Sequence, residues 1–111
     1  MSDYYAPNGT EIDLRTWSEM FKLPRHVGRT EIVLHGYRIT VSTVWLGLDH
    51  SFGDGPPIIF EMMMFSGDPR FNETSDRYST YEEARTAHEY IIERFTAAGG
   101  HVITDEQTLI L

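Results

Sequence analysis

The chain has 111 residues, 41% of them hydrophobic and 13% aromatic, with no cysteine and a formal net charge of −8. This length suits one hydrophobic core and excludes two ordinary domains, and the lack of cysteine excludes disulfides, thiolate metal sites and a thiol nucleophile. The acidity disfavours a nucleic-acid partner, because the basic residues do not cluster. The N-terminus lacks the basic and apolar regions of a secretory signal, and no apolar run is long enough to cross a bilayer, so we expect a cytoplasmic protein without a membrane partner.

The N-terminal segment, residues 1–12, mixes tyrosines with a proline, an asparagine and a glycine. This composition is typical of turns and poorly ordered chain ends. We therefore expect a flexible entry over 1–12, followed by a single α+β domain over 13–111.

A short helix is predicted at residues 13–22. Asp13 is of a residue type that caps helices. Leu14, Trp17 and Phe21 follow at helical spacing and form an apolar stripe. The helix is expected to end before Pro24, since the residue preceding a proline disfavours the helical conformation.

Residues 31–46 are dense in β-branched side chains and predict two strands, at 31–35 and 37–46. His35 and Gly36 supply a plausible tight turn between them. Alternation along the second strand places five side chains on one face, which we expect to face the core: Tyr37, Ile39, Val41, Thr43 and Trp45.

A third strand is predicted at 57–65, where both alternating faces are apolar except for Glu61. Such a strand is typical of one that is covered on both faces or that lies at a subunit contact, so a homo-oligomer stays open. The stretch from 67 to 80 predicts an irregular loop, and residues 101–110 are a candidate last strand.

A long helix is predicted at 80–98, ending at a glycine pair. Its start fits a capping box of Thr80 and Glu83, with Ser79 and Glu82 as the alternative register. Together the elements predict an α+β fold: a small antiparallel sheet of three to four strands packed against one long helix and one short N-terminal helix.

The connection LGLDHSFGDGPP, residues 46–57, gathers Asp49, His50 and Asp54 between two predicted strands. A histidine near carboxylates can act as a base, and glycines let the backbone approach a ligand. The spacing matches neither the calcium loop nor the phosphate loop. The structural alternative is a wide connection in which aspartate and glycine supply turn geometry, and the frequency of these residues in turns favours it.

Glu61 and His88 are the other unusual positions. A carboxylate within an apolar strand needs a partner or a shifted pKa unless it reaches water, and Arg77 or His88 could be that partner. His88 lies on the inward stripe of the long helix, where a lone histidine is more often a hydrogen-bonded core residue than a ligand. No second histidine stands four residues from it, so we expect no metal site and no cofactor.

Two stretches, TVSTVWLGLDHSFGDGPPIIFE and DRYSTYEEARTAH, carry a resemblance. They resemble a group of short bacteriophage and prophage proteins in which a pattern like VSTVFLGLDH, a glycine-rich turn, GPPLLFETMVF and a RYST segment recur. The likeness covers residues 37–90, with Met62 and Met64 where that group has threonine and valine. The resemblance implies a phage or prophage origin, and hence the cytoplasm of a bacterial host, but no particular reaction.

We expect a small phage-type accessory protein that acts without catalysis, by binding a host protein or sequestering a small ligand, for example to counter host defence. It would bind through the 46–57 connection and the methionine-rich strand. The candidate ligand-binding residues are Asp49, His50, Asp54, Glu61, Arg77 and His88. The alternative is a small hydrolase or nucleotide-processing enzyme, whose candidate catalytic residues are Asp49, His50, Glu61 and His88.

A third hypothesis is a structural or assembly component of a virion. The first two hypotheses share one spatial expectation. The turn after Leu46 would fold back so that its charged side chains meet Glu61 beside the long helix.

Overall fold

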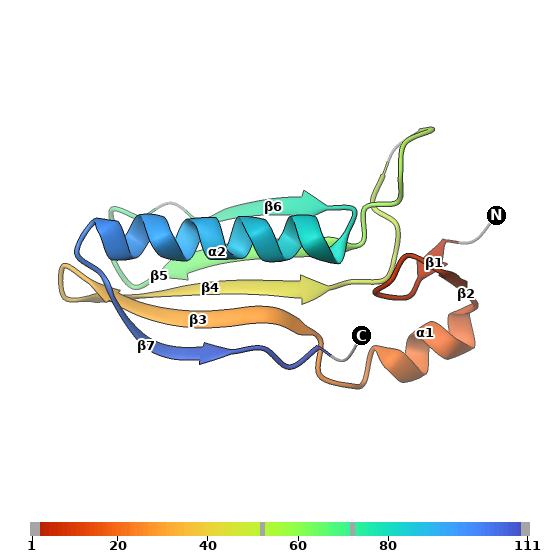
Figure 1. Ribbon diagram of the computed structural model, residues 1–111, viewed down its shortest axis with the longest axis horizontal. Coiled ribbons are helices and arrows are strands. Elements are labelled where there is room, and N and C mark those ends of the chain that lie inside the picture. The colour runs from red at the N-terminus through yellow and green to blue at the C-terminus, as the bar shows by residue number, and fades with distance from the viewer. Residues whose placement is uncertain (1–2, 52, 72, 110–111) are drawn as a thin grey trace.

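A five-stranded antiparallel sheet with one long helix across one face forms the body of the molecule (Figure 1). The computed structural model describes residues 3–51, 53–71 and 73–109. The strands lie in the order β6-β5-β4-β3-β7, and every neighbouring pair is antiparallel. Their bounds are β3 His26–Leu34, β4 Tyr37–Trp45, β5 Phe60–Ser66, β6 Thr74–Tyr78 and β7 His101–Glu106, and the long helix is α2 Tyr81–Ala97.

The N-terminal residues form a separate small unit at one end of the sheet (Figure 1). It contains a two-stranded sheet, β1 Tyr4–Tyr5 and β2 Glu11–Ile12, and the helix α1 Leu14–Met20. The indole nitrogen of Trp17 donates a hydrogen bond of 2.9 Å to the carbonyl of Leu46. The unit therefore closes the end of the main sheet.

The predicted α+β class is confirmed, but the predicted arrangement of three to four strands against two helices is wrong. The main sheet has five strands, a second sheet exists, and α1 lies beside β1 at the sheet end. The fifth strand, β6, falls in the stretch predicted as a loop. It is an edge strand with only Tyr78 less than exposed, so it pairs through its backbone and shows no hydrophobic alternation.

The sequence pattern also did not predict the second sheet or the start of β3 at His26. The N-terminal strands come from the segment predicted as a flexible entry, of which residues 1–2 lie outside the described residues. Tyr5 is anchored by its backbone, donating 2.8 Å to the carbonyl of Gly47. Strand β3 begins at His26, well before the predicted start at 31. Its first half was not predicted because the buried residues Val27 and Thr30 stand among charged residues, which obscures the hydrophobic alternation.

Local capping signals were confirmed. Asp13 accepts a 2.8 Å hydrogen bond from the Thr16 amide at the start of α1. At α2 the box uses Thr80 and Glu83, since each side chain accepts a 3.1 Å bond from the other residue's amide. The tight turn after β3 is also confirmed, with both His35 and Gly36 at positive φ, as a two-residue hairpin turn requires.

The core lies between α2 and the sheet. Ile39, Val41, Thr43 and Trp45 of β4 are buried, as predicted, and Trp45 also packs against the N-terminal unit. Tyr37, predicted on the same face, is instead 37% exposed. The opposite sheet face, here called the open face, carries no helix within the described chain. Its residues on the three central strands are Arg29, Glu31 and Val33 of β3, Arg38, Thr40, Ser42 and Val44 of β4, and Glu61, Met63 and Phe65 of β5. Strand β5 is therefore covered on one face only.

Candidate functional site

The connection between β4 and β5 extends away from the sheet and the helix (Figure 1). Its position 52 lies outside the described residues, and Asp54 is exposed. Asp49 is occupied by its own loop: Oδ1 accepts from the amides of Ser51 (2.8 Å) and Ile58 (2.9 Å), and Oδ2 accepts from the Ser51 hydroxyl. His50 is half-buried and donates its amide to the carbonyl of Ile58.

Asp49 therefore closes the base of this connection. Burial by itself would raise the pKa of the Asp49 carboxyl, but the hydrogen bonds from Ile58 and Ser51 outweigh it and hold the pKa below its usual value. This is the geometry of the structural alternative, in which the aspartate shapes a wide turn.

Glu61 finds its partner in Arg77. The two residues lie opposite each other on β5 and β6, and Nε of Arg77 lies 3.0 Å from Oε2 of Glu61. The Glu61 side chain is 17% exposed. Because alternate residues of a strand point to opposite faces, Glu61 lies on the open face while the next residue, Met62, packs under α2.

His88 is buried on the other face, beneath α2, between two threonines. Its Nε2 lies 2.9 Å from the hydroxyl of Thr30, and its Nδ1 lies 2.7 Å from the hydroxyl of Thr43. Thr30 donates its single hydroxyl proton to Asp105 at 3.0 Å. Nε2 must therefore donate to Thr30 while Nδ1 accepts from Thr43, which assigns the neutral tautomer protonated on Nε2.

The surroundings of His88 keep it neutral. Burial is the main cause that lowers the pKa of His88, to about 4, and nearby Arg85 adds to it against weaker opposition from Asp105 and Glu89. Gly28 faces the ring, and a Cβ at that position would lie 2.7 Å from Nε2. The side chain is thus the hydrogen-bonded core histidine that sequence reasoning favoured.

The candidate residues from the sequence do not converge. Asp54 is on the projecting connection and Asp49 at its base. Glu61 and Arg77 form a pair on the open face, and His88 lies on the helix-covered face. The structure joins Glu61 to Arg77 but does not assemble the four proposed catalytic side chains.

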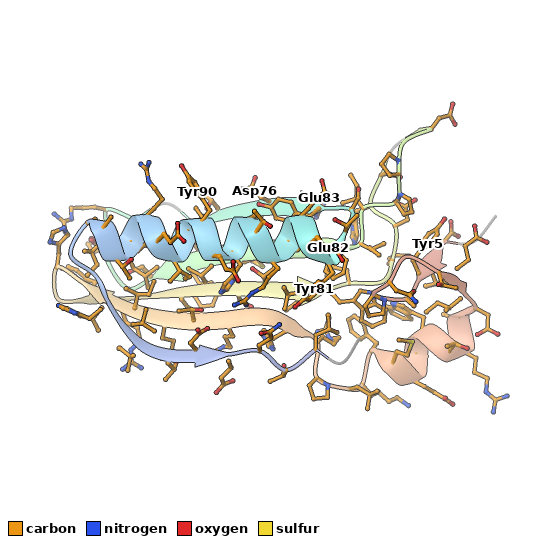
Figure 2. All side chains as sticks on the ribbon, viewed as in Figure 1. Tyr5, Asp76, Tyr81, Glu82, Glu83 and Tyr90 are labelled. Atoms are coloured by element: carbon orange, nitrogen blue, oxygen red, sulfur yellow. The ribbon has the colours of Figure 1, made fainter. Side chains whose placement is uncertain are left out.

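A cavity of about 590 Å³ lies elsewhere, between the C-terminal half of α2 and the segment from β5 to β6. Figure 2 shows Tyr90 on the side of α2 nearer to β6. The lining residues are mainly apolar or aromatic, with two arginines: Leu34, Met64, Arg70, Phe71, Thr74, Tyr90, Ile91, Arg94, Phe95 and Ala98. The cavities beside Thr80 and beside His88 are smaller, about 200 Å³ each.

The two arginines of the cavity differ in their partners. Arg70 forms a two-point pair with Asp68, at 3.1 Å from Nε and 2.9 Å from Nη2, and the pKa of the Asp68 carboxyl is lowered by these bonds. The guanidinium of Arg94 lies 5.9 Å from the centre of the Tyr90 ring. No carboxylate of the described residues lies within ion-pair distance of it.

Sequence reasoning missed this cavity. The only signal it noted was the methionine run, of which Met64 lines the cavity. Tyr90 and Arg94, and Ile91 and Phe95, are spaced four apart, so each pair lies on one side of α2. Arg70 and Phe71 belong to the stretch between β5 and β6, where no pattern predicted contact with the helix.

Comparisons with protein-family models, curated proteins and solved structures found no match to this chain. In the part of the chain that the structure describes, no group of three or more histidine, aspartate or glutamate side chains could hold a metal ion. No helix among those residues has the length and apolar character needed to cross a membrane.

Proposed function

We propose that the protein binds a small amphipathic anion reversibly, without converting it, in the cavity between α2 and the β5–β6 segment. The observation that carries this proposal is an apolar cavity of ligand size whose wall holds an arginine without a carboxylate partner among the described residues. Small-molecule sites typically have about 300–1,000 Å³, mostly apolar walls and a few polar groups that fix orientation.

The lining indicates the class of ligand. Phe71, Tyr90 and Phe95 offer aromatic surface for a flat or aliphatic body. Arg94 presents the planar donors that recognise a carboxylate, sulfonate or phosphate group. The described lining includes no carboxylate and no histidine, so it offers neither of the side chains most used for general acid–base chemistry. Binding without turnover fits this set best.

This proposal keeps the small-ligand form of the accessory-protein hypothesis and moves its site. The phage origin, the cytoplasmic location and a role against host defence stay predictions from the resemblance. The enzyme hypothesis needs Asp49, His50, Glu61 and His88 together, and their distribution over two sheet faces and a projecting turn gives it no support. No observation favours a virion component.

The test is a fluorescence titration with anilinonaphthalene sulfonate, which combines an aromatic body with one anionic group. We expect saturable one-to-one binding by the wild type and at least roughly tenfold weaker binding by Arg94→Glu, because a charge-assisted bond is replaced by repulsion. Arg15→Glu is the matched control: it makes the same change in net charge on α1, where the side chain is 90% exposed.

An Arg94→Glu variant that binds as tightly as Arg15→Glu contradicts the proposed role of Arg94. Absence of saturable binding by the folded wild type contradicts the proposed ligand class.

A further inference from the structure

The open face exposes apolar surface that the monomer does not cover. Met63 is 43% exposed and Phe65 is 39% exposed, both on β5. Val44 of β4 and Val33 of β3 are half-buried on the same face. These apolar side chains lie among polar neighbours such as Thr40 and Ser42. Large apolar side chains left exposed on an uncovered sheet face can mark an interaction site.

The charges on this face balance one another. Glu31 lies 3.1 Å from Arg29 and 3.3 Å from Arg38, and Glu61 lies 3.0 Å from Arg77. Each of these carboxylates already has an arginine partner, so covering the face leaves neither of them buried without a counter-charge.

The same balance favours one kind of partner. The third glutamate on this side, Glu106 of β7, is the register partner of Arg29. The three arginines and three glutamates of this face therefore give it a formal charge of zero. The whole chain carries −8, which makes other surfaces of two copies repel each other. A second copy therefore meets least repulsion at the open face, whereas a basic partner would be drawn to the acidic remainder of the surface.

The area is sufficient for a dimer. Five strands spaced about 4.8 Å apart, with a mean length of about seven residues at roughly 3.3 Å each, outline a face of about 600 Å². Protruding side chains make the accessible area larger than this flat estimate. Two copies together therefore reach the lower part of the roughly 1,200–2,000 Å² of accessible surface that specific interfaces bury.

We infer that the open face is the interface of a homodimer, in which two sheets pack face to face and each α2 lies on the outside. The ligand cavity is on the opposite side of the sheet, beside α2, so it stays accessible in the dimer. This inference does not depend on the proposed ligand.

The experiment is sedimentation equilibrium of the full chain, compared with two variants that each add one negative charge. Standard-size interfaces give dissociation constants from micromolar downward, so we expect the wild type to be dimeric at about 50 µM. Met63→Glu on the open face should weaken the dimer at least tenfold with an unchanged circular dichroism spectrum. Leu14→Glu, at a 56% exposed position of α1, should change the dissociation constant of the dimer less than twofold.

Phe65→Glu provides a second variant on the same face, with the same expected loss, should Met63→Glu not fold. A monomeric wild type at that concentration overturns the inference. So does a dimer whose association is unaffected by the open-face variants, or one that only Leu14→Glu disrupts.

Discussion

At the scale of single residues, His88 shows how the sheet tolerates a polar group in its core. The ring is satisfied from both sides by threonine hydroxyls, and Gly28 leaves the space it occupies. Asp105 lies at the end of this series of hydrogen bonds, and because its carboxylate can only accept, it fixes the direction of each hydrogen bond in the series. A buried imidazole arranged this way stabilises the fold only while it is neutral. In the charged form Nδ1 could no longer accept from Thr43, and the charge would be buried away from water.

This predicts a specific pH dependence. The pKa of His88 is about 4 in the folded chain and about 6.5 when unfolded, so between these values the unfolded state binds more protons. The stability of the fold is then fully present above pH 6.5 and falls as the pH drops towards 4, by about 2 kcal/mol between pH 7 and pH 5. Urea unfolding at the two pH values measures it.

His88→Gln is the comparison, because glutamine can donate and accept but does not titrate. Burial also lowers the pKa of His26, which affects wild type and variant alike. The variant should therefore lose about 2 kcal/mol less than the wild type over this interval. An equal loss in both proteins would show that His88 titrates in the folded chain as it does when unfolded.

At the scale of elements, the sequence predicts structure wherever a local interaction decides it. The helices were found because Asp13 and Thr80 cap them through bonds within one turn. The turn at His35 and Gly36 is equally local. Strand β6 was not predicted because an edge strand forms through its backbone pairing with β5. Its polar residues, TSDRY, show no hydrophobic alternation that would indicate this pairing.

The β4–β5 connection provides the prediction at this scale. Asp49→Ala removes acceptors for three hydrogen bonds and should destabilise the fold by about 2 kcal/mol, measured as a shift of the urea midpoint. Asp54→Ala is the control on the same connection, since that residue is exposed, and it should stay within about 0.5 kcal/mol of wild type. Equal effects of the two substitutions would contradict the structural role of Asp49.

At the scale of the whole molecule, the site could not be predicted because its parts are brought together only by tertiary packing. Arg70 and Phe71 reach the cavity from a stretch without periodicity, and Leu34 reaches it from a distant strand. The residues that did attract attention in the sequence mostly have structural roles: Asp49 shapes a turn, Glu61 pairs across two strands and His88 fills the core. The titratable residues that stand out in the sequence marked positions where a polar group needs a partner. The cavity is lined largely by apolar residues, which in the sequence look the same as residues of the hydrophobic core.

The central claim is that ligand binding takes place in the α2 cavity and not at the 46–57 connection. A residue-resolved map of amide chemical shifts, recorded while anilinonaphthalene sulfonate is titrated into isotope-labelled protein, tests it most directly. The account predicts the largest shifts at Phe71, Tyr90 and Arg94. Largest shifts at Asp49 and His50, or on the open face around Met63, would contradict it.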